Sequence, residues 1–330
     1  MVTDDVPLID GHCHGVLLSD LDAGGFGWWL TEAGSTTRDP WQSMLGLAVR
    51  RWCAPVLDLA AHASPDEYLA RRAELGWREA SSRLLRAAGV TTWLVDTGFA
   101  PPPCSTPAEL AALSAAAAAE VVRIESVAED LAATVSGGDF HASLAERLRA
   151  RAAGAVALKT VVAYRSGLAV PAQRPPMRDT RAAVDRWLTG GAGRLTDPIV
   201  LAWLVHEAAV VCAEAGIALQ FHTGLGDADV RLQDADPLLL KDFLAVTRAS
   251  VVLLHCWPLH RNAFESLLYS SDGRVLPELH YLGAVLWRHH LGRLLDAWIA
   301  DDVLTTADAE RIAHGFGSGN AGRLTSPIAD

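Results

Sequence analysis

Lysine is nearly absent from this sequence, since only Lys159 and Lys241 occur among its 28 lysine and arginine residues. The five cysteines are scattered and include no Cys-x-x-Cys pair. This pattern favours free thiols over a disulfide framework and predicts a cytoplasmic location. Basic residues are also outnumbered by acidic ones, and the net charge of -11 argues against a nucleic-acid partner.

Long apolar runs are missing as well. No run reaches the ~20 residues that a membrane helix needs, and the first residues show no signal-peptide pattern, so we predict no membrane partner. No Gly-x-Gly-x-x-Gly follows the first expected strand, and there is no P-loop, which disfavours the nucleotide-binding folds. We expect a small-molecule substrate as the partner, and self-association into a homo-oligomer stays open.

The order of the expected elements indicates an α/β fold. The expected strands cover residues 6–9, 90–96, 120–125, 155–162, 217–222, 250–256 and 267–271. Helix-like segments separate most of them, and this alternation favours a parallel sheet with crossover connections. The strands are continuously apolar, as in a sheet that is buried on both faces. We therefore predict a distorted TIM barrel that forms a single domain over residues 1–330.

Two regions depart from a regular barrel. Residues 15–88 follow the first strand without an obvious strand of their own and predict a helical insertion or lid. Only 16 residues separate His255 from Asp272, whereas one βαβ crossover needs ~30 residues. One βα unit is therefore expected to be missing, so that the barrel closes with seven strands or stays open. Residues 277–330 predict C-terminal helices.

The first strand leads into Asp10-Gly11-His12-Cys13-His14. Successive side chains of a strand point to opposite faces, so His12 and His14 share one face. Two imidazoles in this arrangement can bind one metal ion, although a pair of histidines also occurs by chance. The pair therefore becomes a candidate metal site only if further ligands lie near it.

Other polar residues stand at the ends of later strands, where the chemistry of such barrels takes place. They are Lys159, His222, His255 and Asp272. Each has an ordinary alternative: a hydrogen-bonded core histidine, a turn aspartate, or a lysine that reaches the surface. A lysine inside an apolar strand is nevertheless costly unless it is paired or neutralised. Unlike arginine, its amine can react with CO2 to give a carboxylated lysine that ligates metal. The agreement of five strand ends favours a catalytic metal site.

Seven stretches carry a resemblance to a known family. They are LIDGHCH (8–14), LVDTGF (94–99), GAVALKTVVAYRSGL (154–168), ALQFHTGLGDAD (218–229), VVLLHCWPLHRNA (251–263), SSDGRVLPELHYLGA (270–284) and SGNAGRL (318–324). The chain resembles the amidohydrolase superfamily. More narrowly, it is similar to the amidohydrolase-related (amidohydrolase 2) group, whose domain also occurs fused to glutamine synthetase-like proteins.

The resemblance implies one or two divalent metal ions, Zn2+ or a similar ion, in a distorted TIM barrel. The metal ligands that it implies are His12, His14, Lys159 as a carboxylated bridging ligand, His222, His255 and Asp272. Asp272 is implied to be the proton acceptor as well. The substrate-binding residues that it implies are Tyr164, Arg165, Asp227 and Asp229.

The expected reaction is hydrolysis of an amide or other C–N bond. A metal-bound hydroxide would attack the carbonyl carbon while Asp272 accepts the proton and returns it to the leaving group. Arg165 is suited to hold a substrate carboxylate through two parallel hydrogen bonds. Two alternatives stay open: a non-hydrolytic decarboxylase of the same superfamily, and an inactive relative that lost a βα unit.

Overall fold

The computed structural model describes residues 1–31, 39–99, 103–135, 137–226, 229–256 and 263–325. The chain divides into two compact units. The first contains Met1–Ala119 and Pro258–Ser326, and the second contains Glu120–Trp257 and Pro327–Asp330. The single domain over residues 1–330, with its insertion and C-terminal helices, stays a prediction from the sequence.

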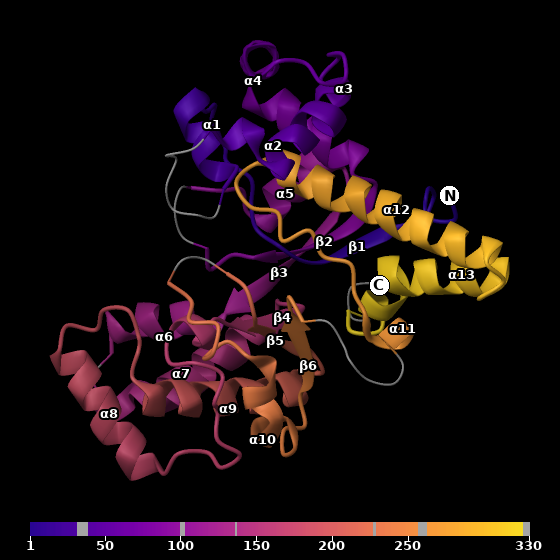
Figure 1. Ribbon diagram of the computed structural model, residues 1–330. Helices are drawn as coiled ribbons and strands as arrows, with labels where there is room; N and C mark the ends of the chain where they lie inside the picture. Colours follow the sequence, from indigo (N-terminus) through magenta and orange to yellow (C-terminus); the bar gives the residue numbers. More distant parts are fainter. Residues whose placement is uncertain (32–38, 100–102, 136, 227–228, 257–262, 326–330) are drawn as a thin grey trace. The chain divides into compact units, whose positions relative to one another are not determined.

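The described residues form six strands (Figure 1). These are β1 Leu8–Cys13, β2 Val90–Asp96, β3 Ala117–Arg123, β4 Ala157–Thr160, β5 Ala218–His222 and β6 Ser250–Leu254. They hydrogen-bond in the order β1-β2-β3-β4-β5-β6. The pairs β1–β2, β3–β4, β4–β5 and β5–β6 are parallel. The carboxyl ends of paired strands therefore lie at the same edge, where the sequence places its polar residues.

The prediction of a distorted TIM barrel, either closed with seven strands or left open, is wrong, because the described residues form six strands. Residues 267–271 form no regular strand, and within the described part of the chain the strand order ends at β1 and β6. After β6, the described chain before residue 267 holds only α11 (Ala263–Ser266), a single helical turn. The 16 residues between His255 and Asp272 are too few for a βα unit. The fold is an α/β fold with an open six-stranded sheet.

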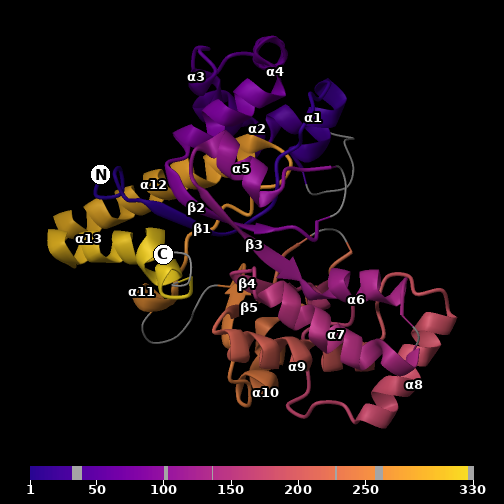
Figure 2. The same cartoon turned by 180° about the vertical axis from the view of Figure 1, so that it is seen from behind.

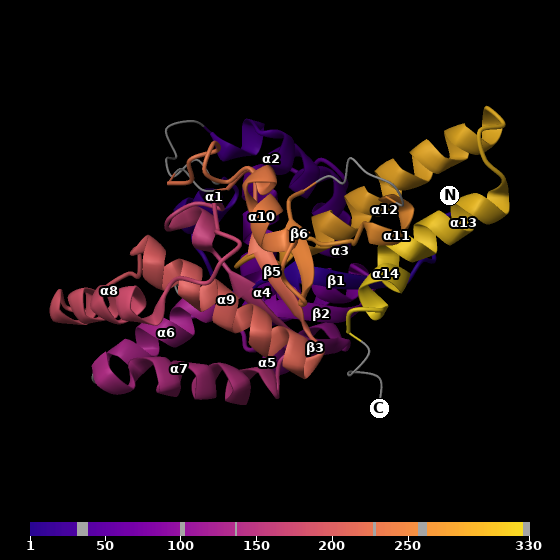
Figure 3. The same ribbon diagram turned by 90° about the horizontal axis from the view of Figure 1, so that it is seen from below.

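Helices of the first unit lie between β1 and β2, after β2, and after β6. They are α1 Ala23–Trp29, η1 Pro40–Gln42, α2 Met44–Ala48, η2 Val49–Cys53, α3 Ala54–Val56, α4 Pro65–Ala87, α5 Pro107–Ser114, α11 Ala263–Ser266, α12 Pro277–Ala300, α13 Thr306–His314, η5 Gly315–Gly319 and α14 Asn320–Gly322. Helices α12 and α13 lie side by side (Figure 3) and share an apolar core that includes Leu295 and Ile312. Another core joins α4 to α12 through residues such as Leu84 and Leu282.

A capping box starts α4. The hydroxyl of Ser64 accepts a hydrogen bond from the backbone N–H of Glu67, and the Glu67 carboxylate accepts one from the Ser64 N–H. We expect Ser64→Ala to lower the free energy of unfolding by about 1 kcal/mol, because one helix N–H loses its acceptor. Urea unfolding of the variant and the wild type measures this. An unchanged unfolding midpoint and slope would contradict the prediction.

In the second unit, helices follow β3, β4 and β5 (Figure 2). They are α6 Ile124–Ala132, α7 Gly137–Ala152, η3 Val162–Tyr164, α8 Met177–Thr189, α9 Pro198–Ala215, η4 Pro237–Leu240 and α10 Lys241–Leu244. Phe140 of α7 and Trp203 of α9 belong to one large core with Leu158 of β4 and Phe221 of β5. These contacts hold β4 and β5 in place, and both strands are buried along their whole length.

One described helix, α9, is long and apolar enough to cross a membrane by length and composition. Length and composition are weak evidence for a membrane span, because the core helices of soluble proteins have them too. In α9, 61% of the 18 residues are buried. Its apolar residues pack in the core of the second unit, which gives their composition a structural reason.

Candidate metal centre

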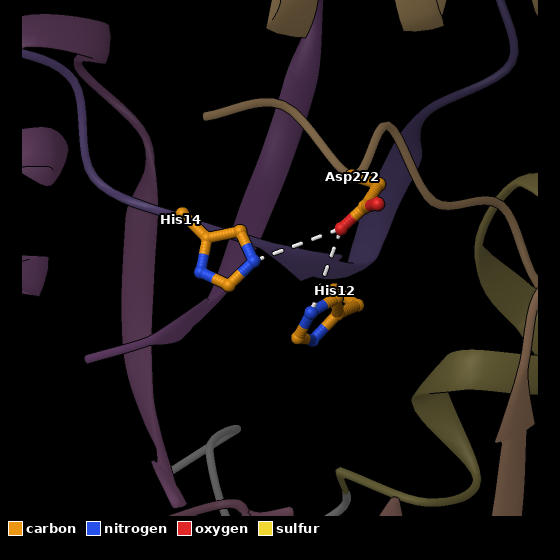
Figure 4. Close-up of side chains that lie close together, drawn as sticks. All are labelled: His12, His14 and Asp272. Carbon is orange, nitrogen blue, oxygen red and sulfur yellow. Dashed lines mark ion pairs between the residues drawn. The ribbon is translucent and has the colours of Figure 1, made fainter. Parts of the chain in front are cut away.

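Three candidate metal ligands come together in the first unit. His12 and His14 leave the end of β1, and Asp272 faces them from the chain that precedes α12 (Figure 4). Asp272 Oδ1 lies 3.6 Å from His12 Nε2 and 3.7 Å from His14 Nε2. One ligand atom from each residue falls within 4.8 Å of the other two. Both imidazoles are buried, whereas the Asp272 side chain is 40% exposed, so the group can be reached from solvent.

The donor set fits a divalent cation. Separations of 3.6–3.7 Å are too long for hydrogen bonds. They are close to the ~3.4 Å that separates two ligands, each about 2.1 Å from one tetrahedral ion. Two imidazole nitrogens and one carboxylate also make up a common ligand set for catalytic zinc. The three residues therefore have the donor atoms and the spacing to supply three ligands to one metal ion.

The orientation of His14 supports the same interpretation. Its Nδ1 lies 3.2 Å from the backbone oxygen of Asp96, the last residue of β2. A carbonyl oxygen only accepts hydrogen bonds, so the Nδ1–H tautomer of neutral His14 is favoured there. The lone pair of Nε2 then points toward Asp272, as a metal ligand requires. Asp96 was not predicted as a site residue, although its place at the end of β2 was the available signal.

Asp272 keeps its place although no regular strand carries it. The Tyr269–Val275 segment, here called the Asp272 segment, runs along β1 in the parallel direction. Gly11 N–H donates to Tyr269 O at 3.0 Å, Asp272 N–H donates to His12 O at 3.1 Å, and His14 N–H donates to Gly273 O at 2.8 Å. These backbone bonds set Asp272 beside the two histidines in spite of the short connection after β6.

Asp10 is a second residue that sequence reasoning missed. Its buried carboxylate accepts hydrogen bonds from the Ser271 hydroxyl at 2.5 Å, the Ser271 N–H at 3.1 Å and the His12 N–H at 3.3 Å. Burial raises the pKa of Asp10 to about 7, although these three donors act in the opposite direction. A carboxylate in the middle of the first strand, two residues before the histidine pair, was the signal that could have singled it out.

The second unit holds the other three predicted metal ligands. Lys159 is buried in β4, between Arg123 of β3 and Gln220 of β5. His222 ends β5, and its ring centroid lies 4.7 Å from that of His255, which directly follows β6. His255 adopts a left-handed backbone conformation with φ of 59°. The action of all six residues at one metal site stays a prediction from the sequence.

The predicted substrate residues occupy different environments. The Tyr164 ring lies 4.4 Å from the His222 ring. A Cβ on Gly226 would come within 2.1 Å of the Tyr164 hydroxyl, so this glycine allows the close approach of the two segments. Arg165 donates to Glu129 at 2.5 Å and to Leu195 O at 3.0 Å. Any substrate carboxylate must therefore use its other N–H groups or displace Glu129.

Asp229 and Asp227 complete the predicted set. Asp229 is exposed and forms an ion pair with Arg194 at 3.2 Å. Asp227 lies outside the described residues. Substrate binding by these four residues stays a prediction.

No family model and no curated protein matches this sequence. Solved structures do resemble it in fold. A protein described as a "putative metal-dependent hydrolase" from Lactobacillus casei ATCC 334 is 23% identical, with a TM-score of 0.85 over 99% of this chain and 96% of that one.

Two sugar-acid isomerases are more distant. Glucuronate isomerase from Caulobacter crescentus is 13% identical, with a TM-score of 0.60 over 100% of this chain and 93% of that one. Uronate isomerase from Thermotoga maritima is 10% identical, with a TM-score of 0.58 over 98% and 95% of the two chains. At these identities the likeness concerns the fold alone.

Proposed function

We propose that this protein is a metal-dependent hydrolase of the amidohydrolase superfamily that cleaves an amide or other C–N bond of a small molecule. The observation that carries the proposal is the convergence of His12, His14 and Asp272 at 3.6–3.7 Å. Its fold likeness to the Lactobacillus casei protein supports it. The finer assignments, namely the amidohydrolase-related group, Zn2+, a carboxylated Lys159 and a cytoplasmic location, are part of the same proposal.

The residues divide the work as follows. His12, His14 and Asp272 would hold a divalent ion, and Asp96 keeps His14 in the tautomer that binds it. When bound, the ion supplies Lewis acidity that polarises a carbonyl and lowers the pKa of water toward about 7. Asp272 is the exposed member of the group, so its carboxylate accepts a proton from the attacking water and returns it to the leaving nitrogen.

Metal analysis tests the proposal. The purified protein is expected to contain about one or two equivalents of Zn2+ or a similar ion, which chelation removes together with turnover of a panel of small amides. Lys159→Ala is expected to lower the metal content, and Lys241→Ala is the matched control, because Lys241 is exposed on α10. A wild-type protein that binds no divalent ion would contradict the proposal. Equal metal content in the two lysine variants would remove Lys159 from the ligand set.

A second reaction deserves a place in the assay. Several of the solved structures of similar fold are uronate or glucuronate isomerases, which favours isomerisation of a uronate as the alternative activity. The panel therefore includes uronates beside amides, and carboxylated aromatics as decarboxylation substrates. Metal-dependent turnover of a uronate without hydrolysis of any amide would replace the C–N assignment. Bound metal without turnover of any of these substrates would favour the inactive relative.

A further inference from the structure

The Asp272 segment is held in a conformation that the chain does not adopt by itself. Asp272 has φ of 48° and Val275 has φ of 60°, and both values lie in the left-handed region. That region costs about 1–2 kcal/mol for a residue other than glycine, and it is least accessible to a β-branched side chain such as valine. Such a segment persists only where surrounding contacts fix it.

Asp10 supplies contacts of this kind from the middle of β1. One carboxylate oxygen accepts from the N–H groups of Ser271 and His12, and the other accepts from the Ser271 hydroxyl. Ser271 Oγ in turn accepts from the N–H of Gly273 at 3.0 Å. The buried Asp10 side chain thus accepts hydrogen bonds from His12 and from Ser271, the residue before Asp272. Through the Ser271 hydroxyl it is also linked to Gly273, the residue after Asp272.

The backbone bonds that hold the Asp272 segment do not use the N–H of Ser271, the residue directly before Asp272. The backbone bonds between residues 11–17 and the Asp272 segment involve residues 269, 272, 273 and 275, and two of these four have positive φ. Ser271 lies between them, and its N–H donates to Asp10. In a regular β-ladder, a backbone carbonyl group of the neighbouring strand would accept the hydrogen bond from the Ser271 N–H. Here the carboxylate of Asp10 accepts it instead, directly beside Asp272.

We propose that Asp10, acting through Ser271, is a positioning residue that sets the distance between Asp272 and the histidine pair. This inference rests on the proposed metal-dependent function, and it assigns to Asp10 a role without contact to metal or substrate. Removing such a partner of a ligand commonly costs 10–100-fold in metal affinity, because the ligand set is no longer held in place before the ion binds.

Co2+ serves as the probe, because its visible absorption reports the number and arrangement of its ligands. Co2+ is titrated into the metal-free full-length protein in competition with a chromophoric chelator, for the wild type, Asp10→Asn, Ser271→Ala and the double variant. Thr91→Val is the matched control, since Thr91 on β2 also donates a side-chain hydrogen bond to β1, at Leu8 O (2.9 Å), without touching the Asp272 segment.

We expect Co2+ to bind about 10–100-fold more weakly to Asp10→Asn and Ser271→Ala, with an altered visible spectrum. The double variant is expected to be no weaker than the weaker single variant, because both substitutions remove the same contact. Thr91→Val is expected to stay within about twofold of the wild type. Urea unfolding of the metal-free proteins at the same temperature confirms that each variant is folded. Ser271→Ala removes a single hydroxyl and provides the test if Asp10→Asn does not fold.

The outcomes separate the two proposals. Wild-type affinity and spectrum in Ser271→Ala and in a folded Asp10→Asn would overturn the positioning role and leave the proposed function intact. Equal weakening by Thr91→Val would also overturn it, because any lost bond to β1 would then suffice. A wild-type protein that binds no Co2+ would overturn the proposed function, and the positioning role with it.

Discussion

Asp272→Asn is expected to lower turnover by about a thousandfold, the middle of the range for a lost general base. Asparagine has nearly the same shape, but its amide neither accepts a proton at neutral pH nor offers a negative charge to the two histidines. The reaction identified with the substrate panel measures the loss. Metal analysis of the same preparation shows how much of it arises from weaker metal binding.

Asp301→Asn is the matched control for this prediction. Asp301 is an exposed aspartate at the C-terminal end of α12, and the same chemical change there is expected to leave turnover and metal content unchanged. Circular dichroism of both variants checks that each is folded. An Asp272→Asn protein that retains more than about a tenth of wild-type turnover would exclude Asp272 as the proton acceptor.

Glu278→Ala is expected to cost about 3–5 kcal/mol of folding free energy. Glu278 is fully buried at the start of α12 and accepts hydrogen bonds from Tyr68 Oη and Arg72 Nε, each at 2.9 Å. Both donors belong to α4, which lies between β1 and β2 in the sequence. Their hydrogen bonds to Glu278 therefore connect α4 to α12. Removing the carboxylate leaves the guanidinium of Arg72, only 5% exposed, without its counter-charge.

Urea unfolding at pH 7 measures this effect, and Glu74→Ala is its control. Glu74 also pairs with an arginine of α4, Arg71, at 2.8 Å, but its side chain is 70% exposed. An exposed pair contributes about 0–1 kcal/mol, so this variant is expected to stay close to the wild type. Equal losses of unfolding free energy in Glu278→Ala and Glu74→Ala would contradict the prediction, because burial of the Arg72–Glu278 pair would then make no difference to stability.

Local patterns predicted much of the secondary structure. The apolar run at 90–96 is β2, and the Ser64-Pro65 start with Glu67 begins α4. The alanine-rich stretch at 107–119 shows the limit of this approach, because alanine favours helix throughout but α5 ends at Ser114. Ala115 takes a left-handed conformation with φ of 56°, and Ala117 already belongs to β3. Strand pairing outweighs the helix propensity of alanine there.

The residue types of the candidate metal centre could be predicted from the sequence. The hydrogen bonds that hold Asp272 beside the histidines could not. Strand alternation was enough to place His12 and His14 on one face, and the structure brings Asp272 to them. The bonds that hold Asp272 connect residues about 260 positions apart, such as Asp10 and Ser271, and no local pattern records them. The short connection before Asp272 was visible in the sequence, but its consequence for Asp272 depended on those distant bonds.

The docking of the Asp272 segment on β1 also has a consequence for synthesis of the chain. Ser270 donates to His12 O across 258 positions of sequence, so the histidine pair is made long before its carboxylate partner exists. At ~5–20 residues per second, the interval is roughly 10–50 s on the ribosome. During that time β1 lacks the Asp272 segment as its neighbour, and at the proposed metal site its two imidazoles would bind an ion without their carboxylate partner. At that proposed site, tight metal binding would therefore report that the Asp272 segment has been synthesised and has docked on the first strand.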